Sequence, residues 1–169
     1  MPVQRRLLLA VVLVASLLAG CGFQLRSKQA FVFQTIAVTP ENGGGVATDV
    51  TRYLGSIVRP VAPAAAGQPA PDVILDILQE LREKTVVGVN ASGQVREFQL
   101  RTRVRFRLRT SQGRELIAPT EIVQQRDISF NESAVLAKEA EEALLYRDMQ
   151  TDVVQQLLRR LAAVKSLEQ

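Results

Sequence analysis

The sequence predicts an α+β fold in which two helices pack on one face of a four-stranded mixed sheet. Three observations predict this class. Residues 31–38 resemble a strand, residues 72–130 contain three long segments with alternating apolar and polar residues, and residues 133–164 carry one long amphipathic helical pattern. With a short helix after the first strand, the order is βαβββα, which would form a single two-layer domain.

The first two elements are short. Residues 31–38 are predicted to be a strand because aromatic and β-branched residues dominate them, and the turn-forming residues 40–45 stop it. Within residues 46–57 an apolar residue recurs every three or four positions, which predicts an amphipathic helix. Residues 60–71 are rich in proline and alanine and are predicted to form a surface loop.

The next two strands are predicted over residues 72–85 and 94–110. In the first strand, the face predicted to enter the core carries Val73, Leu75, Ile77 and Leu81. The opposite face carries the polar residues Asp72, Asp76, Glu80, Arg82 and Lys84. In the second, five arginines alternate with apolar residues and share the outer face: Arg101, Arg103, Arg105, Arg107 and Arg109. At about 3.3 Å per residue, this strand would extend about 56 Å, so its ends are expected to project beyond the core.

Neighbouring strands must place their apolar faces on the same side of the sheet, which restricts their register. For the first pair, the preferred register places Glu80 opposite Arg101 and Asp76 opposite Arg105, with residues 88–93 at the tip. Both pairings set an acid against an arginine.

The third long strand is predicted over residues 114–130, after a three-residue loop that ends in Gly113. The preferred register places Arg109 opposite Glu115 and Arg103 opposite Glu121. Two interpretations of the arginines therefore stay open. They form either a solvated face with cross-strand ion pairs, each worth roughly 0.2–1 kcal/mol, or a basic strip for phosphates or a partner.

Pro119 places the third long strand at an edge or a bulge of the sheet. The final helix is predicted to begin near Ser133, with Asn131 or Ser133 as its N-cap. Its apolar stripe is expected to face the core: Leu136, Ala140, Ala143, Tyr146, Met149, Val153, Leu157, Leu161 and Val164, widened by Leu144, Leu145, Val154 and Leu158.

The composition excludes several kinds of site. The sequence has no His and a single Cys, so it cannot supply an imidazole base, a Ser-His-Asp triad or a His and Cys zinc site. The glycines at 43–45 lack the Lys and Ser or Thr of a phosphate-binding loop, and no metal-ligand spacing occurs among the acids. A Ser-Lys dyad stays open, although nothing positions one. We expect no enzyme activity, no metal and no cofactor.

The N-terminus has the pattern of an export signal. Arg5 and Arg6 precede an apolar run over residues 7–18, which is shorter than the roughly 20 residues of a membrane-spanning helix. Residues 18–21 read Leu-Ala-Gly-Cys and resemble the lipobox of bacterial lipoproteins. An ordinary signal peptide before an unrelated Cys, or a permanent membrane span, is the alternative.

The lipobox resemblance implies that residues 1–20 are a lipoprotein signal peptide and that Cys21 carries a covalent S-diacylglycerol and an N-acyl group. Residues 21–28 would then be a lipidated tether, and residues 29–169 a single α+β domain. Because Gly22 rather than Asp follows the Cys, the resemblance favours the outer membrane. Loss of the signal peptide would lower the net charge from +4 to +2, which leaves little support for nucleic-acid binding.

Four segments are similar to the LptE family of lipopolysaccharide-assembly lipoproteins. Residues 21–26 read Cys-Gly-Phe-Gln-Leu-Arg, and residues 93–100 read Gly-Gln-Val-Arg-Glu-Phe-Gln-Leu. Residues 136–139, Leu-Ala-Lys-Glu, and 144–149, Leu-Leu-Tyr-Arg-Asp-Met, resemble the C-terminal helix of the family. The resemblance follows the same order along nearly the whole chain after residue 20, and it implies the βαβββα fold.

The LptE resemblance also implies a function. Members form a one-to-one complex with the large outer-membrane β-barrel LptD, sit inside the barrel as a plug, and assist the delivery of lipopolysaccharide to the outer leaflet. Lys138 matches a basic position of the family helix that is a candidate contact for lipopolysaccharide. The hairpin tip at residues 90–92 is neutral here, so Arg96 is the nearest substitute for the basic residue found there in some members.

A second function of a different class stays open at this stage. The chain could be a free lipid-anchored module that binds an amphiphile or a cell-wall fragment in the periplasm. Co-purification with a large barrel protein would separate the two functions.

The anchor leads to the first prediction. Cys21→Ala removes the thiol that would receive the diacylglycerol, so we expect this variant to incorporate no labelled fatty acid in cells. The parent chain, labelled in parallel, is the control. Equal labelling of both proteins would contradict the assignment of Cys21.

Overall fold

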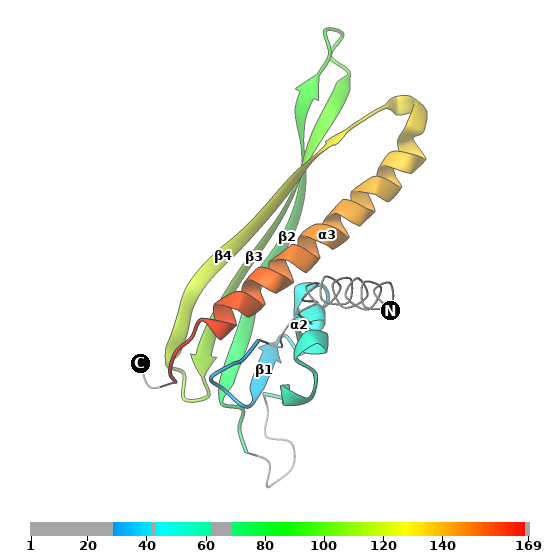
Figure 1. The fold of residues 1–169 in the computed structure, drawn as a ribbon. Helices are drawn as coiled ribbons and strands as arrows, with labels where there is room; N and C mark the ends of the chain where they lie inside the picture. Colours follow the sequence, from blue (N-terminus) through cyan, green and yellow to red (C-terminus); the bar gives the residue numbers. More distant parts are fainter. Residues whose placement is uncertain (1–28, 42, 62–68, 168–169) are drawn as a thin grey trace, which may run out of the picture.

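Within the described residues, four strands form one mixed sheet, and the two helices cover the same face of it (Figure 1). The strands lie in the spatial order β1 (Ile36–Thr39), β2 (Val73–Val89), β3 (Val95–Thr110) and β4 (Glu115–Ser129). The helices are α2 (Val46–Leu54), continued by the 3-10 turn Gly55–Ile57, and α3 (Val135–Ala162), preceded by the 3-10 turn Glu132–Ala134. β1 runs parallel to β2 and the other pairs are antiparallel. The predicted fold class and element order are confirmed.

The computed structural model describes residues 29–41, 43–61 and 69–167. The predicted signal peptide, Cys21 and nearly all of the tether lie outside these residues, and so does the middle of the loop predicted at 60–71.

The first strand is shorter than the sequence predicted. Residues 31–35 precede β1 and do not belong to it. Their backbone is held by a side chain instead, because the carboxylate of Asp72 accepts hydrogen bonds from the N–H groups of Gln34 and Thr35 at 2.8 and 2.9 Å. The rings of Phe31 and Phe33 stack with their centroids 5.0 Å apart.

A β-bulge in β2 changes the predicted register of the first hairpin. Asp76 lies opposite Arg107, two residues from the predicted partner Arg105. After Ile77 the register shifts by one residue, because Leu78 has no partner in β3. The predicted register was therefore wrong. The prediction that inward and outward residues alternate without interruption along the whole strand was wrong as well.

The extra residue exchanges the two faces of β2 beyond the bulge. Glu80 lies opposite the buried Val104 rather than Arg101, and Lys84 lies opposite the buried Leu100, so both side chains are on the helix side of the sheet. Leu81, which was predicted to enter the core, is 38% exposed on the opposite face.

The second hairpin follows its prediction only near its loop. Arg109 lies opposite Glu115, and Gly113 has a φ of 91°, as a three-residue loop requires. Beyond this point, two register shifts place Glu121 opposite Arg105 rather than Arg103. The shifts accommodate the irregular stretch around Pro119, which interrupts an edge strand as predicted.

The helix α3 buries mainly its second half. Asn131 caps the preceding 3-10 turn, because its side chain accepts a hydrogen bond from the N–H of Ser133 at 3.1 Å. Leu136 is 83% exposed and Leu144 is 55% exposed, and Ala140 and Ala143 are exposed too, so the prediction of one continuous core-facing stripe was wrong for these four residues. The first half of α3 extends past the main core toward the end of the sheet that carries the β2–β3 turn (Figure 1), which we call the upper end.

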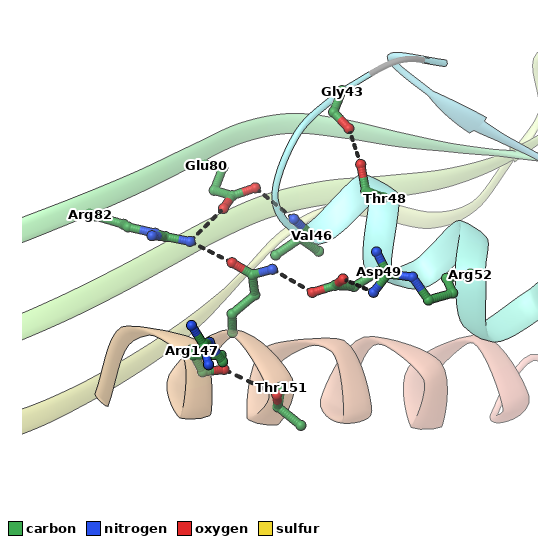
Figure 2. A network of polar contacts seen from close by, with 10 residues as sticks. Gly43, Val46, Thr48, Asp49, Arg52, Glu80, Arg82, Arg147 and Thr151 are labelled. Atoms are coloured by element: carbon green, nitrogen blue, oxygen red, sulfur yellow. Dashed lines mark hydrogen bonds and ion pairs between the residues drawn. The ribbon is translucent and has the colours of Figure 1, made fainter. Parts of the chain in front are cut away.

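Polar contacts attach the two helices to β2 (Figure 2). The carboxylate of Glu80 accepts a hydrogen bond from the N–H of Val46, the first residue of α2, at 3.0 Å. The guanidinium of Arg82 lies 3.9 Å from Glu80 and donates to the side chain of Gln150 in α3. Gln150 in turn donates to Asp49 in α2. The bulge directs Glu80 and Arg82 toward this junction.

A glycine substitution tests the junction. Gly45 has a φ of 60°, and a Cβ there would collide with the carboxylate of Glu80 that caps α2. We expect Gly45→Ala to lower the free energy of unfolding by about 1–3 kcal/mol, measured by urea denaturation. Gly44→Ala is the matched control, because nothing lies within 4 Å of its Cβ position. Equal stability of the two variants would contradict the inference that residue 45 must be a glycine beside Glu80.

Candidate functional site: the arginine row and the upper cleft

Five arginines of β3, which we call the arginine row, lie on the face of the sheet opposite the helices: Arg101, Arg103, Arg105, Arg107 and Arg109. The residues between them point to the other face and are buried, so the alternation predicted from the sequence is confirmed for β3. Neither of the two helices in the described part of the chain covers this open face of the sheet (Figure 1).

The two arginines nearest to β1 share one carboxylate. The Nε atoms of Arg107 and Arg109 lie 2.7 and 2.8 Å from Oδ2 of Asp76, and the hydroxyl of Thr39 donates to Oδ1 at 2.8 Å. Burial by itself raises the pKa of Asp76, but these hydrogen bonds together outweigh it and lower the pKa from 3.8 to about 2. Asp76 thus connects β1, β2 and β3, and it occupies both arginines.

The next arginines differ in how they are engaged. Arg103 forms an ion pair of 2.5 Å with Glu83, and Arg101 donates to Gln99 at 2.9 Å. Arg105 is exposed, and no ion pair or hydrogen bond joins its side chain to any part of the chain that the structure describes. The row therefore contains one free guanidinium, near its middle.

Apolar side chains accompany that free guanidinium. Leu81 and Val123 lie one pleat further along the neighbouring strands, opposite Arg103, and they are 38% and 44% exposed. We call Arg105, Leu81 and Val123 the arginine patch. An unpaired arginine close to exposed aliphatic side chains is common in protein interfaces.

A second candidate site lies between the upper end of the sheet and the first half of α3. It is a cleft of about 240 Å³, which we call the upper cleft. Its lining combines apolar and charged side chains: Lys84, Phe98, Ile128, Ser129, Phe130, Val135, Lys138, Glu139 and Glu142.

Lys138, a candidate from the sequence, lines this cleft. Its Nζ lies 2.9 Å from Oγ of Ser129 and 2.9 Å from a carboxylate oxygen of Glu141. The other candidate, Arg96, does not line the cleft, and its guanidinium lies 3.4 Å from the side-chain oxygen of Gln94. The structure therefore does not bring the two predicted contacts together.

Sequence reasoning missed Lys84, a second lysine in the cleft. Its Nζ lies 2.6 Å from a carboxylate oxygen of Glu142 and 4.3 Å from the centre of the Phe98 ring. The alternation of β2 assigned Lys84 to the open face, and only the bulge at Leu78 places it under α3. No signal in the sequence marks that bulge apart from the adjacent apolar residues Ile77 and Leu78.

The tip of the β2–β3 hairpin projects beyond α3 and β4 (Figure 1). Val86, Val87 and Val89 near this tip are 46%, 49% and 59% exposed. The hairpin thus exposes apolar side chains beyond the upper cleft, although its tip carries the polar turn of residues 90–94.

The described residues contain neither a metal-binding cluster nor a membrane-spanning helix. No group of three or more acidic or Cys side chains there could hold a metal ion. No helix there combines the length and apolar character required to cross a bilayer.

The ion pairs of Asp76 with Arg107 and Arg109 predict a stability effect within a defined pH range. A pKa lowered below its ordinary value means that the carboxylate stabilises the fold above about pH 4, and that this contribution is lost as the pH falls through about 2. We expect Asp76→Asn to lower the free energy of unfolding by about 2 kcal/mol at neutral pH. In urea denaturation, the difference from the parent protein should shrink between pH 4 and pH 2.

Asp127→Asn is the control for this series. Asp127 lies at the other end of the sheet and accepts a hydrogen bond from Gln99 alone, at 3.1 Å. Its replacement should change the free energy of unfolding by less than about 0.5 kcal/mol. A difference for Asp76→Asn that is unchanged between pH 4 and pH 2 would contradict the ion-pair origin of the effect.

The chain resembles known proteins over most of its length. The model of the LptE family, described as lipopolysaccharide-assembly, matches residues 33–161. The structure of the uncharacterized lipoprotein B from Nitrosomonas europaea is 36% identical, with a TM-score of 0.68, and covers 84% of this chain and 91% of that chain. None of the curated proteins matches the chain.

Two more distant structures show the same fold. The rare lipoprotein B from Shewanella oneidensis is 20% identical, with a TM-score of 0.59 over 76% of this chain and 92% of that chain. A minor lipoprotein from Acinetobacter baumannii is also 20% identical, with a TM-score of 0.60 over 79% and 94%. Because the family match spans most of the described fold and the Nitrosomonas lipoprotein shares over a third of its residues, this chain belongs to the LptE family of lipopolysaccharide-assembly proteins.

Proposed function

We propose that this protein is an outer-membrane lipoprotein that forms a one-to-one complex with the β-barrel LptD, plugs its lumen, and assists the insertion of lipopolysaccharide into the outer leaflet. Membership of the LptE family supports this role in lipopolysaccharide assembly. The protein would act by binding and would need neither a metal nor a cofactor. The acyl groups on Cys21 would hold it at the membrane, on the periplasmic side and within the barrel lumen.

The observation that carries the partner proposal is the open, charged face of the sheet. The lumen of a large membrane β-barrel is polar, so a plug needs a charged outer surface rather than a second apolar core. The arginine row supplies such a surface, and the carboxylates of Asp76 and Glu83 engage three of its five members. Arg105 remains for a carboxylate of the barrel wall, with Leu81 and Val123 to exclude water around it.

The upper end of the molecule supports contact with lipopolysaccharide. A lipid A headgroup combines phosphates with acyl chains, and the upper cleft combines the ammonium group of Lys138 with the apolar side chains of Phe98, Ile128 and Phe130. The exposed valines of the hairpin extend this apolar surface. Arg96 lies outside the cleft, so it would contact a part of the ligand that extends beyond the cleft.

Co-purification tests the partnership. A pull-down of the full lipidated protein in mild detergent should recover one large barrel protein in stoichiometric amount. Arg105→Glu places a carboxylate where a partner's acid is expected, so recovery of the barrel should fall, and should fall further when the salt is lowered.

Arg52→Glu is the matched control. Arg52 lies on α2 in the helix layer, its side chain is 73% exposed, and its replacement makes the same change of charge. Recovery with this variant should equal that of the parent protein. Absence of a stoichiometric barrel protein would overturn the partner proposal, and equal losses for both variants would remove the arginine patch from it.

A further inference from the structure

We infer that Lys84 is a second phosphate-binding residue, which acts together with Lys138 from the opposite wall of the upper cleft, and that Glu142 and Glu141 occupy the two ammonium groups until a phosphorylated amphiphile replaces them. The inference rests on the proposed contact with lipopolysaccharide and adds to it a residue, a ligand group and a competition within the chain.

The two lysines reach the cleft from different layers. Lys84 belongs to β2 in the sheet, and Lys138 belongs to the first turns of α3. Both line the same space of about 240 Å³. Each of the two has a single carboxylate partner, and both partners belong to α3, at distances of 2.6 and 2.9 Å.

Those carboxylates can be exchanged at little cost. The side chain of Glu141 is 49% exposed and that of Glu142 is 23% exposed, so water can solvate both when they leave the lysines. Ion pairs that water can reach contribute little to stability, on the order of 1 kcal/mol. The first half of α3 rests on a small apolar cluster around Leu100, Ile128 and Met149, which leaves its first turns less constrained than the second half.

A phosphate matches the two lysines better than two glutamates do. It carries between one and two negative charges and three acceptor oxygens in one compact group, so it offers separate acceptors to the two ammonium groups that line the cleft. The ring of Phe98 lies beside the ammonium of Lys84, and Phe130 and Val135 continue the apolar wall. A phosphate joined to an acyl chain would therefore satisfy both the charged and the apolar parts of the cleft.

The two halves of the inference predict changes of opposite sign. Lys84→Gln removes a ligand of the phosphate, so the affinity of the full protein for purified lipopolysaccharide should fall about tenfold. Glu142→Gln removes the competitor and a repulsive charge, so the affinity should rise about threefold. Lys165→Gln, near the distant end of the chain, removes the same charge outside the cleft and should leave the affinity unchanged.

Three comparisons make the test specific. Lys84→Arg keeps the charge and should restore binding, which separates the loss from a defect in folding. Dephosphorylated lipopolysaccharide should bind more weakly and with equal affinity to the parent protein and to Lys84→Gln. Millimolar inorganic phosphate should not displace lipopolysaccharide, because it lacks the acyl chains; displacement would identify free phosphate rather than a lipid headgroup as the ligand.

Failure of the inference is distinguishable from failure of the proposed function. If Lys138→Gln weakens binding while Lys84→Gln binds like the parent protein, Lys84 has no such role and the proposed function stands. If Glu142→Gln weakens binding, the competition is wrong. If the parent protein does not bind lipopolysaccharide at all, the proposed contact itself is overturned.

Discussion

The β-bulge at Leu78 is the constraint on which the arrangement of this protein depends. One unpaired residue in β2 exchanges the faces of the strand, so that its first part sends Val73, Leu75 and Ile77 into the core while its second part sends charged side chains to the same side. Those charged side chains then bind the helices: Glu80 caps α2, and Arg82 reaches Gln150 of α3. Without the bulge, the same residues would lie on the open face, and the helices would lose these attachments.

The bulge divides the molecule into two parts with different kinds of stabilisation. Near β1, a large apolar cluster fills the space between the sheet and both helices, and Asp76 connects three strands on the open face. Toward the upper end, the apolar cluster is small and the contacts of α3 with the sheet are mainly polar, such as the pairing of Lys84 with Glu142. Polar contacts near water can be replaced by contacts with water or a ligand at little cost in free energy. Exposing large buried apolar side chains costs much more. The rigid part therefore supports an upper part whose cleft can accept a ligand.

On the open face, ion pairs decide which arginines are available to a partner. Five adjacent arginines would repel one another if none were paired, and the carboxylates of Asp76 and Glu83 reduce this repulsion by engaging three of them. The irregular registers of both hairpins decide which arginines obtain an acid. Glu121 lies opposite Arg105 without forming an ion pair with it, so this guanidinium stays available in the middle of the arginine row.

The sequence by itself determined the fold class, the order of the elements, the inward and outward faces of β3 and the loop at Gly113, because each follows from periodicity or turn chemistry within one segment. It also placed Lys138 on the last helix, through its resemblance to the LptE family. Only the tertiary structure decided the pairing of Asp76 with Arg107 and Arg109, the exposure of Leu136, and the position of Lys84 beneath α3. The bulge at Leu78 shifts the register by one residue and so brings Lys84 to the helix side, and the register depends on contacts between strands rather than on the composition of either strand. Leu136 is exposed because the first half of α3 extends past the main core.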